Sequence, residues 1–231
     1  MKLASIFEEF LGLFFPESCV VCGEPLLRAE ENICLSCLLK LPRTNNFQEE
    51  DNAAEKLLAG RFPFERIATF CYFTKGGILQ PIIHQVKYNG KAHLGETLGL
   101  LFGRDLVGSD FLSPVQLIIP VPLHPKKQKQ RGYNQAEMIA RGISKATDIP
   151  VSTNNLVRIV HNPTQTKRNK MQRWENVKDI FTVNHPEEFE NKHILLVDDI
   201  ITTGSTIEAC AHALLASRGI KISIATIGEA I

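Results

Sequence analysis

The sequence lacks a large net charge, a long apolar run and clustered histidines. Its 26 basic and 25 acidic side chains leave a formal net charge of +1, so bulk electrostatics do not call for a nucleic-acid partner. No stretch is long and apolar enough to span a bilayer, and we expect no membrane insertion. The seven histidines form no HxH or HExxH pair, which excludes those metal motifs. With 231 residues, the chain can hold one α/β domain and a small appendage.

The cysteines are few, but four of them form two CxxC pairs near the start of the chain: Cys19, Cys22, Cys34 and Cys37. Each CxxC turn aims two thiolates at one point, so the spacing predicts a zinc ribbon with a closed, structural Zn²⁺ site. The alternative is a pair of disulfides, which need an oxidising compartment. Glu8 and Glu9 interrupt the first apolar stretch, which is unlike a secretory signal, so we expect zinc and a cytoplasmic protein. We expect Cys71 and Cys210 to be buried free thiols.

The apolar spacing over residues 3–15 predicts an amphipathic helix that packs against the ribbon. We therefore expect residues 1–45 to form the N-terminal helix and the zinc ribbon. Residues 42–60 are polar and acidic without strand periodicity, which indicates a connector. A second domain is then predicted over residues 60–231.

Within that domain, strand and helix signals alternate. Residues 66–74 predict a strand, which is followed by a helix through Tyr88 and by a second helix over residues 94–106. A second buried strand is predicted within residues 116–124. Such alternation is typical of an α/β fold with a mainly parallel sheet.

The strongest signal lies at residues 194–206, where an apolar strand leads into two acids and a hydroxyl-rich turn. Asp198 and Asp199 stand at the strand's carboxyl end, which is the edge where ligands bind in open α/β sheets. The turn residues are Thr202, Thr203, Gly204, Ser205 and Thr206. Because residues 207–215 predict a helix, the turn's amides can form an anion site at a helix N-terminus. Helix capping alone would explain only one acid and one hydroxyl.

A second anion site is predicted after the strand within residues 116–124. A basic loop from Lys126 to Arg131 and then Gly132 precede a helix that we expect to end near Ala146. Two anion sites at the ends of parallel strands fit a ligand with two phosphate groups. The alternative is a solvated basic loop without a ligand.

The run at residues 194–206 resembles the 5-phosphoribosyl-1-pyrophosphate (PRPP) motif of type I phosphoribosyltransferases. That motif has an apolar strand, two acids, two apolar residues and then Thr-Thr-Gly-x-Thr. The resemblance implies the type I α/β fold, with Asp198 and Asp199 as catalytic residues that hold the ribose hydroxyls. It implies that residues 202–206 cradle the 5-phosphate, and that Mg²⁺ accompanies the pyrophosphate.

Further segments narrow the resemblance to the ComF/GntX-like family, which is linked to bacterial competence and DNA uptake. They are the Leu-Phe-Phe-Pro lead-in to the first CxxC pair, residues 120–135, and residues 158–181. The resemblance implies further PRPP contacts from Arg131, Gly132 and Lys87, although a plain helix C-cap also explains the segment around Lys87.

Residues 158–181 correspond to the mobile hood that covers the substrate in the type I fold. They are polar and basic, and Gln165, Arg168 and Arg173 would form a lid that excludes water and faces the leaving pyrophosphate. The alternative is a disordered surface loop.

The expected function is Mg²⁺-dependent phosphoribosyl transfer to an acceptor that the sequence does not identify. Thr202 stands where purine-salvage members carry an acid, which argues against a hypoxanthine-type acceptor. The alternative is a non-catalytic protein of the same fold that binds single-stranded DNA or a DNA-uptake partner such as a helicase. Aromatic rings beside positive charge, which single-strand binding favours, occur at Tyr133 with Arg131 and at Trp174 with Arg173.

Overall fold

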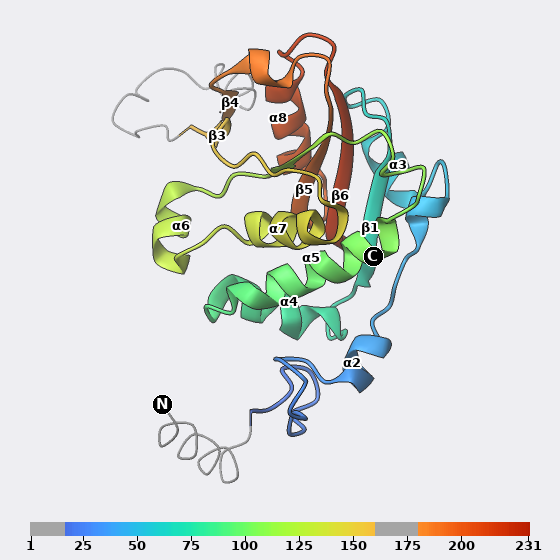
Figure 1. The fold of residues 1–231 in the computed structure, drawn as a ribbon, viewed down its shortest axis with the longest axis vertical. Coiled ribbons are helices and arrows are strands. Elements are labelled where there is room, and N and C mark those ends of the chain that lie inside the picture. The colour runs from blue at the N-terminus through green and yellow to red at the C-terminus, as the bar shows by residue number, and fades with distance from the viewer. Residues whose placement is uncertain (1–16, 160–179) are drawn as a thin grey trace.

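The computed structural model describes residues 17–159 and 180–231, and its centre is a four-stranded parallel sheet (Figure 1). The strands lie in the order β1 (Ile67–Phe73), β6 (Lys221–Ala230), β5 (His193–Ile201) and β2 (Leu117–Pro120). Each neighbouring pair is parallel, so the carboxyl ends of all four strands meet at one edge. The predicted mainly parallel α/β architecture is confirmed.

The central strand β5 explains why its sequence is continuously apolar. Leu195 and Val197 pack into the core on one face of the sheet, whereas Ile194 and Leu196 pack into the core on the other. Successive strand residues point to opposite faces, so a strand with helices on both sides needs apolar residues at every position.

Helices cover both faces of this sheet (Figure 1). One core contains the inward faces of α4 (Leu79–Tyr88), α5 (Ala92–Leu106) and α7 (Gln135–Thr147). The opposite core contains α3 (Ala53–Leu58) and α8 (Ser205–Leu214). Apart from α3, which precedes β1, these helices lie in the connections between parallel strands, as the alternating sequence pattern predicted.

The remaining elements are short. They are α2 (Leu35–Leu39), η1 (Asn46–Gln48), α6 (Pro125–Arg131), β3 (Leu156–Arg158), β4 (Phe181–Val183) and η4 (Pro186–Phe189). β3 and β4 form a separate antiparallel pair. No helix among residues 17–159 and 180–231 combines the length and apolar character needed to cross a membrane.

The segment expected to be a polar connector is packed against the sheet instead. It contains α3, whose capping box joins the Asn52 side chain to the Glu55 amide and the Glu55 side chain to the Asn52 amide. Its buried Asn46 also donates to the Thr69 hydroxyl on β1, at 2.9 Å. The division into residues 1–45 and 60–231 stays a prediction, and the helix predicted over residues 3–15 lies outside the described residues.

Candidate functional site

The two acids lie within the last residues of β5, at the carboxyl edge of the sheet. β5 continues to Ile201, so the acids belong to the strand itself. The Asp199 Oδ1 atom pairs with Lys87 Nζ at 2.9 Å, from the last turn of α4. The Asp198 Oδ1 atom accepts from the backbone amide of Asp199 at 2.8 Å. The fold therefore brings three of the predicted site residues together: two from β5 and Lys87 from α4, which lies 112 positions before Asp199 in the chain.

Burial shifts the pKa of Asp198. Asp198 is almost fully buried, and the loss of solvation, followed by the negative charge of Asp199, raises the pKa of Asp198 to about 8. The other carboxylate oxygen of Asp199, Oδ2, is buried and has no hydrogen-bond partner among residues 17–159 and 180–231. A buried carboxylate oxygen without a partner is costly, so this atom is a natural acceptor for a ligand hydroxyl or a hard cation.

The turn after β5 leads directly into the N-terminus of α8. Gly204 is the residue before the helix and has a φ of 73°, a conformation that glycine adopts without strain. The hydroxyls of Thr203 and Ser205 lie 3.1 Å apart, and the side chains of this turn are exposed. The first amides of α8 are unpaired within the helix, which suits an anion.

An arginine that the sequence reasoning missed supports this turn. Arg61 donates to the backbone carbonyl of Thr203 and forms an ion pair with Glu208 on α8. Arg61 precedes β1 in the chain, and no local motif marks it. The contact arises only because β1 and β5 belong to the same sheet.

The basic segment predicted as a loop is a helix, α6. Pro125 occupies its first turn, and His124 Nδ1 accepts from the Lys126 amide at 3.2 Å. Gly132, with a φ of 87°, ends the helix. The flanking proline and glycine provide the start and stop signals, and the charged sequence between them has no apolar face that would predict a helix.

α6 and α4 enclose a small hollow of about 150 Å³ beside the acid pair. Its lining is basic and aromatic: Lys87, Tyr88, Lys127, Gln130 and Arg131. The Arg131 guanidinium lies 5.8 Å from the centre of the Tyr88 ring. Because Lys87 also contacts Asp199, the hollow is connected to the acid pair through one side chain. The roles predicted for Arg131, Gly132 and Lys87 stay predictions.

The residues predicted to form a lid, Gln165, Arg168 and Arg173, lie outside the described residues. The chain on either side of them is described. Arg158 in β3 pairs with Phe181 in β4, and its guanidinium lies 5.4 Å from the Phe181 ring centre. The two ends of the segment are thus held side by side.

The four paired cysteines converge, as the CxxC spacing predicted. Their Sγ atoms all lie within 4.8 Å of one another, and the Sγ atoms of Cys22 and Cys34 are 3.8 Å apart. Tetrahedral zinc with sulfur ligands at about 2.3 Å places neighbouring sulfurs at about 3.8 Å. Burial opposes ionisation of Cys19, but backbone amides that donate to its sulfur lower its pKa to about 6. The cluster can hold a metal ion and is consistent with a structural zinc.

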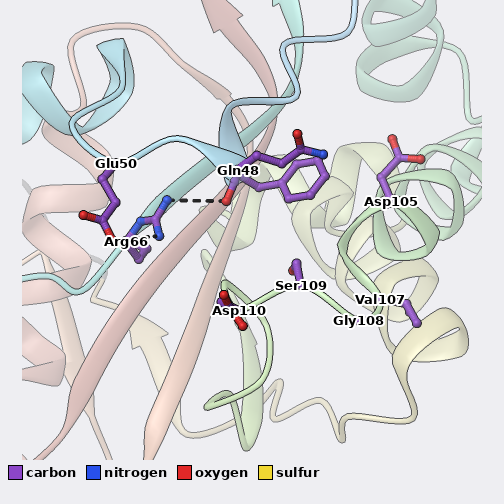
Figure 2. Close-up of a pocket in the computed structure, with 9 residues that line it drawn as sticks. Gln48, Glu50, Arg66, Asp105, Val107, Gly108, Ser109 and Asp110 are labelled. Carbon is purple, nitrogen blue, oxygen red and sulfur yellow. Dashed lines mark hydrogen bonds and ion pairs between the residues drawn. The ribbon is translucent and has the colours of Figure 1, made fainter.

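A larger cavity lies elsewhere, at the amino edge of the sheet. It measures about 600 Å³, and Figure 2 shows Glu50 and Arg66 on one side of it, Asp105 on the other, and Ser109 and Asp110 between them. Arg66 immediately precedes β1, whereas the acid pair lies at the opposite ends of the parallel strands. Despite its size, this cavity is therefore separate from the acid-pair site.

Comparison with known proteins identifies the class of domain. The family profile described as "Phosphoribosyl transferase domain" matches residues 132–229, which include the acid pair and the turn. The chain therefore carries a phosphoribosyltransferase-type domain, of the type I fold that the resemblance implied. Among solved structures, an allosteric regulatory enzyme of purine biosynthesis aligns with 58% of this chain and 25% of its own, at 18% identity and a TM-score of 0.41.

Several relatives carry curated names that refer to competence or to the use of DNA. Competence protein F of Haemophilus influenzae is 34% identical over 59% of this chain, and the match spans 61% of that protein. DNA utilization protein YhgH of Escherichia coli strain K12 is 25% identical, over 89% of this chain and 87% of its own. Competence protein ComFC of Bacillus subtilis is 32% identical over 43% of this chain and 38% of its own. With the domain match, these similarities support a ComF-like family of phosphoribosyltransferase type.

Proposed function

We propose that this protein binds PRPP with Mg²⁺ at the carboxyl edge of its sheet and transfers the phosphoribosyl group to an acceptor not yet identified. We further propose that it acts in the cytoplasm in the handling of DNA taken up by the cell, a role suggested by the names of its relatives. The observation that carries the binding proposal is the buried Asp199 Oδ2 atom, which has no partner in the part of the chain that the structure describes and lies beside an exposed turn at a helix N-terminus.

Each part of the site has a role in this proposal. The amides at the start of α8 receive the 5-phosphate, because unpaired helix amides favour an anion. Asp198 and Asp199 accept from the ribose hydroxyls, and Lys87 holds Asp199 in place through their ion pair. The cations around the α4–α6 hollow face the pyrophosphate. Mg²⁺, when bound, neutralises pyrophosphate charge and assists its departure, and the carboxylate oxygens here are ligands that it prefers.

Calorimetric titration tests the proposal. PRPP with Mg²⁺ is titrated into the zinc-loaded protein and into the Asp198→Ala/Asp199→Ala double variant. We expect saturable one-site binding to the first and its loss in the second. Glu137→Gln is the matched control, because Glu137 pairs with Arg141 on α7, outside the acid-pair site. Equal affinity in the double variant would refute the assignment of the acid pair. Pyrophosphate release with candidate acceptors then tests catalysis.

A second candidate function is binding of single-stranded DNA, and one observation favours it. Tyr88 is 68% exposed, and the centre of its ring lies 4.9 Å from the centre of the His84 ring and 5.8 Å from the Arg131 guanidinium. Lys127 lines the same hollow. Exposed aromatic rings between cations are what sequence-independent single-strand binding uses.

Fluorescence anisotropy with a labelled oligothymidylate tests this candidate. We expect Tyr88→Ala to weaken binding roughly tenfold, because base stacking contributes about 1–3 kcal/mol. Tyr72→Ala is the control, since Tyr72 is a partly exposed tyrosine on β1. Binding that does not weaken with rising salt, or that Tyr88→Ala leaves intact, would exclude this surface. If both functions hold, PRPP and the oligonucleotide should compete for Lys87 and Arg131.

A further inference from the structure

Arg61 joins the turn after β5 to the first turn of α8. Its Nη1 atom donates to the carbonyl oxygen of Thr203, and its Nη2 atom pairs with the Glu208 carboxylate. The side chain is 28% exposed and that of Glu208 is 29% exposed, so the pair is partly shielded from water. The two contacts use two nitrogens of one planar guanidinium, which fixes the geometry more tightly than a single contact would.

The contact to Thr203 determines the direction in which the turn's backbone points. In a trans peptide the carbonyl of one residue and the amide of the next point in opposite directions. Since the Thr203 carbonyl is held toward Arg61, the Gly204 amide is directed away from it. Gly204 is itself packed over Leu58 of α3, because a Cβ added at Gly204 would lie 2.2 Å from a Leu58 methyl carbon. The segment from α3 to β1 therefore holds the turn through two contacts, that of Leu58 with Gly204 and that of Arg61 with Thr203.

The contact to Glu208 neutralises a carboxylate that would otherwise repel an anion bound at the start of α8. Glu208 lies in the first turn of α8, where an acid is favourable for the helix dipole but repels an anion bound at the same end. The His212 ring also lies near Glu208, with Nε2 4.0 Å from Oε1. Arg61 supplies the permanent positive charge that neutralises Glu208, because a guanidinium stays protonated at any physiological pH.

We propose that Arg61 is a positioning residue for ligands that carry a 5-phosphate: it sets the backbone of the turn and cancels the charge of Glu208. This role rests on the proposed function, since it assumes that the turn receives a ribose 5-phosphate group. It concerns only that half of the ligand. The pyrophosphate half faces the α4–α6 hollow, which Arg61 does not line.

The experiment measures ribose 5-phosphate and pyrophosphate separately by calorimetry, with PRPP as the reference. We expect Arg61→Gln to weaken ribose 5-phosphate binding roughly tenfold, the loss expected for a charge-assisted contact, and to leave pyrophosphate affinity within about twofold. The double variant Arg61→Gln/Glu208→Gln should recover part of the loss, because it removes the uncompensated carboxylate. The affinity of Arg61→Lys for ribose 5-phosphate should lie between those of the wild type and Arg61→Gln, since lysine retains the charge without the two-point contact. Arg141→Gln, which breaks the Glu137 ion pair on α7, is the control.

The outcomes separate this inference from the proposed function. If wild-type protein binds PRPP but Arg61→Gln binds ribose 5-phosphate equally well, Arg61 has no such role. Equal losses for ribose 5-phosphate and pyrophosphate, with no recovery in the double variant, would reduce Arg61 to a structural contact and overturn the proposal. Thermal unfolding of each variant identifies a general loss of folding. If wild-type protein binds neither PRPP nor ribose 5-phosphate, the proposed function and the role of Arg61 fail together.

Discussion

At the scale of single residues, the protonation of Asp198 links the site to stability. An unfolded aspartate titrates near pH 3.9, whereas burial and the neighbouring Asp199 raise the pKa of Asp198 to about 8 in the folded protein. Between these values the folded state binds more protons than the unfolded state. The contribution of Asp198 to the free energy of unfolding is therefore largest below about pH 4 and is lost as the pH rises toward 8.

Asp198→Asn tests this linkage, because the amide stays neutral at every pH. We expect the stability of the variant relative to wild type to increase from pH 5 to pH 8, as measured by urea unfolding at each pH with zinc present throughout. Titration of groups that do not interact with Asp198 cancels in the difference between the two proteins. A constant difference across this range would mean that Asp198 is ionised in the folded protein and that Lys87 compensates its charge.

At the scale of elements, the turn before α8 needs glycine for two separate reasons. Gly204 has a φ of 73° and lies against Leu58, whereas Gly108 has a φ of 78° and open space where a Cβ would stand. Gly108→Ala should therefore cost about 1 kcal/mol from the backbone alone. Gly204→Ala should cost roughly 2–4 kcal/mol, because contact with Leu58 adds to the strain. Urea unfolding measures both, and equal costs would show that Leu58 moves aside freely.

The elements that could be predicted from the sequence are those whose pattern is periodic. β5 and the acid pair follow from a buried apolar run with two acids at its end, and α4, α5, α7 and α8 follow from apolar spacing. α3 and α6 could not be predicted in this way. α3 has only six residues and depends on its capping box, and α6 has no buried residue. The contact of Arg61 with Thr203 joins residues 142 positions apart, and only the sheet order brings them together.

At the scale of the whole molecule, the cysteine cluster and the sheet share one core. Cys19, Cys37 and Ile33 belong to the same continuous core as Phe70 of β1 and Phe102 of α5. A carboxylate of Glu31 also lies 2.6 Å from His93 Nε2 at the start of α5. The cysteine cluster is thus packed against the domain, so a substitution at the cysteines should also lower the stability of the sheet and its helices.

Cys22→Ser tests this coupling, because Cys22 is exposed whereas Cys19 and Cys37 are buried. We expect the variant to retain little zinc and to lose roughly 3 kcal/mol of stability, which corresponds to a Tm lower by about 6–12 °C for a chain of this size. Cys71→Ala is the control: Cys71 is buried in the same core but stands outside the cluster, so this variant should be destabilised yet keep one zinc per chain. Metal analysis and thermal unfolding on the same samples separate the two effects. Zinc loss without a change in Tm would mean that the ribbon folds and unfolds independently of the sheet, despite the shared core.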